Sequence, residues 1–270
     1  MARITVLMGI YNCASTLVEA LDSLYAQTYQ DFKIVLCDDG SKDDTYQVAK
    51  AYADKKTNII LIRNDENKGL NYTLNHCLDY ADTEFCARMD GDDVSMPERF
   101  EKEITFLDEH PDYAVVSAPC TYFDEHGIFG EAHGRGVVKP QHFVRRSPVS
   151  HAPCLVRTNV LKSVGGYTVD EKLIRVEDYH LWFKIFAAGY KLYQMPKSLY
   201  LMRDNRDAIS RRTWKTRRNE VYVKLVGYKM IGLPWYYYIY AIEPLILFLL
   251  PTSIYKILHK RKRRINTDRG

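Results

Sequence analysis

Short apolar runs alternate with segments of helical periodicity through the first 117 residues of the chain. Continuous apolar runs of this length are typical of strands that are covered on both faces. Leu17, Leu21 and Leu24 instead recur every three or four residues, as on the buried face of a helix. We therefore predict strands at 4–8, 33–38, 58–62, 84–89 and 114–117, and helices near 17–25, 44–54, 70–80 and 97–109.

This alternation of strands and helices predicts the fold class. Right-handed crossovers between such elements build a mostly parallel, Rossmann-like sheet flanked by helices. Ligands bind such sheets beyond the carboxyl ends of the strands. The residues that directly follow each strand are therefore the first candidates for binding and catalysis.

The pattern weakens after residue 117, where Gly, Pro and His become frequent up to about residue 175. We predict irregular structure with short strands there, then a helix at 176–188 and a strand at 190–195. From about residue 211 the chain is basic and of helical character. These changes predict a domain over 1–210, divided into halves 1–117 and 118–210, and a helical C-terminal appendage over 211–270.

Charge is distributed unevenly along the chain. The formal net charge is +4, but residues 1–200 carry −7 and residues 201–270 carry +11. A basic C-terminal part indicates anionic lipid or a phosphate-bearing substrate, and we do not expect nucleic acid as a partner. A solvated basic tail without a partner is the alternative.

The six cysteines form no C-x-x-C pair, which argues against a zinc site and a small disulfide-stabilised scaffold. A reducing cytoplasm is the simpler interpretation. The apolar run at 4–8 is too short for the core of a signal peptide. We therefore expect a cytoplasmic protein.

Two carboxylates, Asp38 and Asp39, end the second predicted strand and are followed by Gly40 and Ser41. A carboxylate at this place can accept hydrogen bonds from a ribose hydroxyl or a base N–H. The alternative is an Asx-turn that leads into a helix cap. A dinucleotide-binding domain would also place an acid here, but it requires G-x-G-x-x-G after the first strand, where this chain has only Gly9.

A denser acidic group, Asp90, Asp92 and Asp93, follows the fourth predicted strand. Three carboxylates in four residues repel one another unless a cation is present. Hard oxygen ligands suit Mn²⁺ or Mg²⁺, which would offset negative charge on a leaving diphosphate. The alternative is an acidic turn that caps the helix beginning near Pro97. Farther along, Glu177 and Asp178 open a helix, whose dipole favours an ionised carboxylate, as a general base requires. The alternative is a carboxylate at a helix start without a catalytic role.

Together these segments resemble the family 2 glycosyltransferases, over roughly residues 3–212. The resemblance rests on residues 6–12, 38–41, 67–70 with Asn75, 87–93 with Pro97 and Arg99, 165–167 and 177–182. It implies a GT-A fold and an inverting transfer of sugar from a nucleotide-sugar donor to a hydroxyl acceptor. The donor would bind to the half 1–117, the acceptor would bind to the half 118–210, and UDP is the expected nucleotide on family frequency.

Residue roles follow from the same resemblance. Tyr11, Asn12, Asp39, Asn75 and Asp90 would bind the nucleotide sugar, with Asp39 reading the base. Asp90 and Asp92 would associate with the metal, with Asp92 as the direct ligand. Asp178 would deprotonate the acceptor hydroxyl.

The chain departs from the family late in the domain. Relatives often carry His where this chain has Asn205. If that His contacts metal or diphosphate, then Arg203, Asn205 and Arg211 become the candidate diphosphate contacts here, with bidentate arginines as the stronger partners. A catalytically silent relative that binds a nucleotide sugar or a membrane partner remains the alternative function.

The segment 231–258 is apolar and rich in Trp and Tyr, and a cluster of five basic residues follows at 260–264. Prolines and Glu243 interrupt the apolar run, which is typical of helices that lie in a membrane interface rather than cross it. We therefore predict peripheral attachment of residues 231–264 to anionic lipid on the inner face of the cell membrane. Such attachment would fit a lipid-linked acceptor in surface-polysaccharide assembly. A buried packing helix and a spanning segment are the alternatives.

Overall fold

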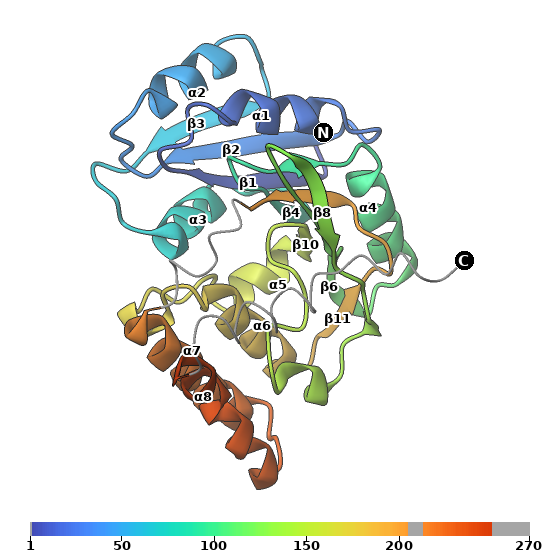
Figure 1. Ribbon diagram of the computed structural model, residues 1–270. Helices are drawn as coiled ribbons and strands as arrows, with labels where there is room; N and C mark the ends of the chain where they lie inside the picture. The colour runs from blue at the N-terminus through green and yellow to red at the C-terminus, as the bar shows by residue number, and fades with distance from the viewer. Residues whose placement is uncertain (1, 205–212, 250–270) are drawn as a thin grey trace.

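A mixed eight-stranded sheet forms the centre of the computed structural model, which describes residues 2–204 and 213–249 (Figure 1). Its strands in spatial order are β3 (Ile59–Arg63), β2 (Phe32–Asp38), β1 (Ile4–Ile10), β4 (Phe85–Arg88), β10 (Cys154–Arg157), β6 (Tyr113–Ser117), β11 (Lys191–Gln194) and β9 (Gly136–Val137). β1 to β4 run parallel, as do β6 and β11, whereas β10 is antiparallel to both of its neighbours and β9 to β11. The prediction of a mostly parallel sheet is confirmed.

A second, four-stranded sheet lies beside the first. It has the order β5 (Val94–Ser95), β12 (Tyr200–Arg203), β7 (Cys120–Asp124) and β8 (Gly127–Glu131). β12 runs parallel to β7 and antiparallel to β5. Because β5 follows the acidic residues 90–93 directly, this sheet holds the far end of the acidic segment.

Helices cover both faces of the large sheet. One face packs against α1 (Leu17–Tyr25), α2 (Thr45–Ala53) and α4 (Arg99–Glu109), and the other against α3 (Leu70–Asp79), α5 (Thr158–Ser163) and α6 (Glu177–Ala187). Short 3-10 helices, η1 (Pro140–Phe143) and η2 (Glu171–Leu173), complete the second half. Alternate residues of β1 enter the two cores: Val6 and Met8 face α1, whereas Leu7 faces α3 and α6.

The C-terminal helices are α7 (Trp214–Met230), η3 (Trp235–Ile242) and α8 (Glu243–Leu249). Val223 and Tyr228 of α7 are fully buried in the core that includes Phe183 of α6. On α7, Lys224 is also buried, and its Nζ donates to the Tyr240 carbonyl oxygen at 3.2 Å. The predicted appendage is helical in its described part, and α7 is packed on the domain rather than held away from it.

No helix within residues 2–204 and 213–249 is long and apolar enough to cross a membrane. Residues 250–264 of the predicted lipid-binding segment lie outside the described residues.

The contact between α6 and α7 depends on Gly227. A Cβ atom at this position would lie 2.2 Å from ring carbons of Phe183. Such an overlap forces the two helices apart, and overpacking of this kind costs about 1–3 kcal/mol.

We expect Gly227→Ala to lower the free energy of unfolding by about 1–3 kcal/mol, measured by urea denaturation. Helix propensity alone predicts the opposite, since alanine is favoured over glycine by about 1 kcal/mol. Lys229→Ala, at an exposed position of the same helix, is the control and should change little. An equally stable Gly227→Ala variant would contradict the packing argument.

Candidate active site

Four of the predicted donor residues, Tyr11, Asn12, Asp39 and Asp90, lie at the carboxyl ends of β1, β2 and β4, as expected for a parallel sheet. Two loops are joined here through Asn12, whose φ is +49°. The Asn12 amide donates to Ser41 Oγ at 3.0 Å, and Asn12 Oδ1 accepts from the Lys42 amide at 2.9 Å. Tyr11 beside it is 40% exposed. Asn12 therefore orders the loops, and the Tyr11 ring is accessible to a ligand.

Asp39 is buried among hydrogen-bond donors of the protein. Its carboxylate accepts from Asn64 Nδ2 at 2.8 Å and from the amides of Lys68 and Gly69 at 2.9 Å each. An ionised carboxylate has about four acceptor positions, so one position remains for a base N–H. Its neighbour Asp38 is paired with Arg63 at 2.9 Å.

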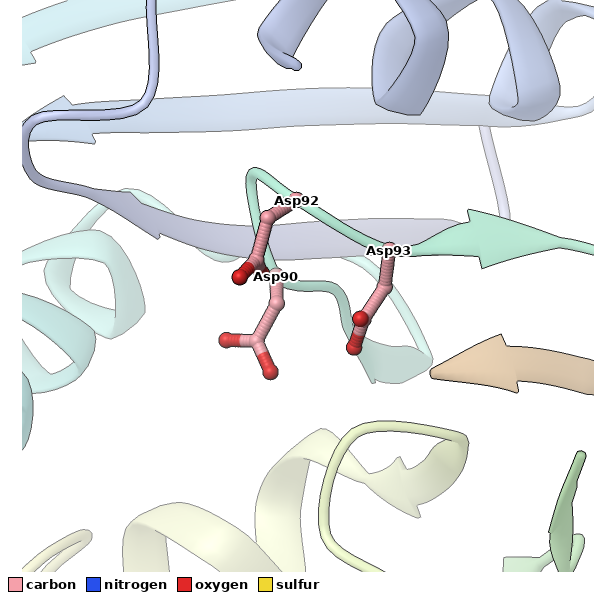
Figure 2. Close-up of side chains that lie close together, drawn as sticks. All are labelled: Asp90, Asp92 and Asp93. Atoms are coloured by element: carbon pink, nitrogen blue, oxygen red, sulfur yellow. The ribbon is translucent and has the colours of Figure 1, made fainter. Parts of the chain in front are cut away.

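The acidic loop, residues 90–93, brings three carboxyl groups together after β4. One oxygen each of Asp90, Asp92 and Asp93 lies within 4.8 Å of the others (Figure 2). Burial, together with the charges of Asp90 and Asp92, raises the pKa of Asp93 to about 8. The pKa of Asp92 is also raised, first by lost hydration and then by Asp90.

The raised pKa values of Asp92 and Asp93 bear on whether a cation fits the acidic loop. The carboxyl groups are held close enough to disfavour each other's ionised forms, which a divalent cation would favour. The donor set is all oxygen, as Mn²⁺ and Mg²⁺ prefer. The residues therefore fit a hard divalent cation.

Buried side chains hold the backbone at the start of the acidic loop in place. Arg99, fully buried on α4, donates through Nη2 to the carbonyl oxygens of Arg88 (3.0 Å), Cys154 (3.2 Å) and Ala152 (3.3 Å). Its counter-ion is Glu103, also fully buried, at 3.2 Å. The Asp90 amide donates to Tyr200 Oη at 3.2 Å. No role for Tyr200 was evident from the sequence, and none for Arg99 beyond family resemblance, although Arg99 is a charged residue on the apolar face of α4.

Arg203 contacts the acidic loop, and its guanidinium is already paired with groups of the protein. Its amide donates to Asp93 Oδ1 at 2.7 Å and its Nε to the Asp92 carbonyl oxygen at 2.9 Å. The guanidinium also pairs with Glu19 of α1 and lies 4.5 Å from the Phe123 ring centre. Its predicted diphosphate contact would require exchange of these partners. Asn205 and Arg211 lie outside the described residues.

Asn75 of α3 contacts the backbone of Tyr167 on both sides of its amide group. Its Nδ2 donates to the Tyr167 carbonyl oxygen at 2.7 Å, and its Oδ1 accepts from the Tyr167 amide at 2.8 Å. The Tyr167 hydroxyl in turn is 2.8 Å from His151 Nε2. Asn75 thus holds a turn of the second half, and its role toward a nucleotide sugar stays a prediction.

Two adjacent carboxyl groups, Glu177 and Asp178, open α6. Burial raises the pKa of Asp178, and burial with the Asp178 charge raises the pKa of Glu177 to about 7. Glu177 Oε2 is buried and has no hydrogen-bond partner among the described residues. Arg88 acts on both carboxyl groups, since its charge favours their ionised forms. The two ends of the site are therefore linked electrostatically through Arg88, which the sequence analysis did not single out.

Profiles of two glycosyltransferase groups match the chain. Glycosyl transferase family 2 matches residues 5–160, and glycosyl transferase family group 2 matches residues 87–258. The putative glycosyltransferase EpsE of Bacillus subtilis is 36% identical over 99% of this chain and 96% of its own length. AmsE of Erwinia amylovora, an amylovoran biosynthesis glycosyltransferase, is 32% identical over 80% of this chain and 82% of its own.

A third relative has a named reaction. WfaP of Escherichia coli, a UDP-Glc:alpha-D-GlcNAc-diphosphoundecaprenol beta-1,3-glucosyltransferase, is 26% identical over 71% of this chain and 73% of its own.

Solved structures share the fold at low sequence identity. Staphylococcus aureus TarS 1–349 in complex with UDP is 19% identical, with a TM-score of 0.66 over 94% of this chain and 76% of TarS. The mannosyltransferase PcManGT of Pyrobaculum calidifontis, in complex with GDP-Man and Mn²⁺, is 19% identical, with a TM-score of 0.64 over 96% of this chain and 79% of its own. The predicted GT-A fold is confirmed.

The raised pKa of Glu177 predicts a pH-dependent loss of stability. Between its usual pKa of 4.5 and the value of about 7 in the fold, the folded state keeps a proton that the unfolded state has released. The free energy of unfolding therefore falls as pH rises through that window. Glu177→Gln removes this contribution, and we expect it to be the more stable protein at pH 8 by about 1–3 kcal/mol, with the gain fading toward pH 4.

Urea denaturation across pH 4–8 measures this difference. Glu98→Gln is the matched control, because the pKa of that exposed glutamate is lowered by Lys102 and its replacement should bring no gain. Parallel pH curves for wild type and Glu177→Gln would contradict the burial of this carboxyl group.

Proposed function

The chain belongs to family 2 of the glycosyltransferases, and we propose that it transfers a sugar from a UDP-sugar to an acceptor hydroxyl with inversion at the anomeric carbon. The observation that carries this proposal is the acidic loop at the carboxyl end of β4, together with Glu177 and Asp178 within the electrostatic reach of Arg88. One group suits a diphosphate with its cation, and the other suits the deprotonation of a hydroxyl.

On the donor side, Tyr11, Asn12 and Asp39 bind the nucleotide. The exposed ring of Tyr11 offers a stacking surface, and Asp39 keeps one acceptor position for the base. Asp92 and Asp90 hold Mn²⁺ or Mg²⁺, with Asp93 as a third carboxylate beside them. The cation, when bound, supplies positive charge to the leaving diphosphate.

On the acceptor side, Asp178 takes the proton of the attacking hydroxyl. Its raised pKa strengthens it as a base, while the α6 N-terminus and Arg88 favour its ionised form. General base catalysis adds about 10²–10⁴-fold to a rate. Positioning the hydroxyl against the donor supplies much of the remainder.

The named relatives support an acceptor class. The acceptor named for WfaP is a sugar on a lipid diphosphate, and its donor is a UDP-sugar. AmsE is named for the biosynthesis of amylovoran. We extend this class to the present chain: a glycan or lipid-linked acceptor, used in surface-polysaccharide assembly.

The C-terminal helices support attachment to a membrane surface. In η3 and α8, five exposed large apolar residues are spaced three or four positions apart, and we call them the apolar row. The row consists of Trp235 (84% exposed), Ile239 (68%), Ile242 (48%), Ile246 (55%) and Leu249 (78%). The opposite side is anchored by buried Ala241 and by the Glu243 carboxylate, 3.8 Å from Lys224 Nζ. Apolar side chains that are followed in the sequence by a basic cluster suit the interface of an anionic bilayer, on the inner face of the cell membrane.

Release of nucleoside diphosphate from a panel of UDP-, GDP- and dTDP-sugars tests the transferase. We expect release from a UDP-sugar with Mn²⁺, none with EDTA, and a loss of about 10²-fold or more in Asp92→Ala. Asp54→Ala is the control, since Asp54 is an exposed residue at the end of α2 that pairs with Lys50. Release that neither EDTA nor Asp92→Ala reduces would overturn the metal assignment, and silence across the panel with acceptor present would favour a nucleotide-sugar-binding protein without activity.

Vesicle co-sedimentation tests the membrane surface. Ile239→Asp with Ile246→Asp should weaken binding to anionic vesicles at least about tenfold, because each isoleucine loses about 1.5–3 kcal/mol of apolar burial. Ile128→Asp is the matched control, an isoleucine 60% exposed on β8. Equal loss in both proteins, or no binding by the wild type, would contradict attachment through this row.

A further inference from the structure

Arg88, the last residue of β4, is a buried cation directly before the acidic loop; only 6% of its surface is exposed. Its two terminal nitrogens contact the two carboxylate oxygens of Asp90, one each. This is a bidentate arginine–carboxylate pair, the strongest geometry for such an ion pair.

The same Asp90 carboxylate belongs to the group of three that fits a divalent cation. The guanidinium occupies one acceptor position on each Asp90 oxygen, so a metal ion bound there would share the carboxylate with Arg88. Arg88 and the cation would then compete for the charge of one carboxylate. Because both are positive, occupancy by one disfavours the other.

We propose that Arg88 is a built-in competitor of the divalent cation at Asp90, which keeps cation affinity low until a nucleoside diphosphate is present. This inference rests on the proposed function, because it takes the acidic loop as the cation site. It assigns to Arg88 a role in positioning and in setting affinity, without contact between Arg88 and the reacting atoms.

The backbone of Arg88 cannot move away from Asp90 when a cation binds. Its strand is hydrogen-bonded on both sides, by β1 and β10, and its carbonyl oxygen is held by Arg99 at 3.0 Å. A guanidinium released from Asp90 would thus stay buried and need another anion. Its Nε already has no acceptor within the described part of the chain.

Two kinds of anion are available to the released guanidinium. Glu177 and Asp178 both lie within its field, and a bound diphosphate would add negative charge beside the acidic loop. Loss of a buried charge's only partner is costly, so the exchange becomes favourable when cation and diphosphate enter together. Cation and nucleotide binding are therefore expected to be cooperative.

Titration calorimetry with Mn²⁺ on the full chain, without and with UDP, tests the proposal. We expect UDP to tighten Mn²⁺ binding to the wild type. In the absence of UDP, Arg88→Gln should bind Mn²⁺ about tenfold more tightly than the wild type, within the range typical of coupled sites. Arg88→Lys keeps the buried charge but loses the bidentate contact, and it should lie between the two.

Asp90→Asn separates competition from a general effect of charge. In that background Arg88→Gln should no longer tighten Mn²⁺ binding, whereas a long-range charge effect would persist. Suppose that the wild type binds Mn²⁺ measurably and that Arg88→Gln binds it with equal or lower affinity. This result overturns the competition but not the metal site. If Arg88→Gln does not fold, an affinity of Arg88→Lys equal to that of the wild type overturns it instead. No Mn²⁺ binding by the wild type, with or without UDP, overturns both.

Discussion

The acidic loop exists in this form because a buried arginine holds the backbone around it. Three carboxyl groups within 4.8 Å repel one another, and an unsupported loop would open to separate them. Arg99 joins the end of β4 to residues 152 and 154 through three carbonyl oxygens, so the loop begins from a fixed point. Tyr200 and the Arg203 amide hold its other parts. The repulsion is thereby retained in the fold, and it adds to the effect of burial in raising the pKa of Asp93.

The segments 1–117 and 118–210 interlock in the large sheet, because β10 lies antiparallel between β4 and β6. Asp39 and the acidic loop belong to the first segment, and α6 with its two carboxyl groups belongs to the second. Arg88 stands at this junction as a cation that acts on both. The protein thus balances clustered negative charge with few buried arginines, and each of them serves several partners. Such sharing makes the charge state of one half depend on that of the other.

Much of the fold and the identity of the acidic groups could be predicted from the sequence. Hydrophobic periodicity is a local signal, so it located α4, α6 and the strands β1, β2, β3, β4 and β6 to within a few residues. It did not reveal the second sheet, because β12 pairs with β7 about 80 residues away and neither strand has a distinctive pattern. The engagement of Arg203 with Glu19 and that of Asn75 with Tyr167 likewise depend on tertiary proximity. Residue types indicate which chemistry a site can perform, but only the folded structure shows which side chains already pair with other residues of the protein.

The close contact of Gly227 with Phe183 has a consequence for geometry at a membrane. Helices that touch through a glycine approach at the short end of the usual 8–10 Å spacing. α6, which carries Asp178, therefore packs closely against α7, and α7 in turn contacts the helices that carry the apolar row. A bilayer bound by that row would stand at a set height from Asp178. The enzyme would then select acceptors by the height of their reactive hydroxyl above the lipid headgroups.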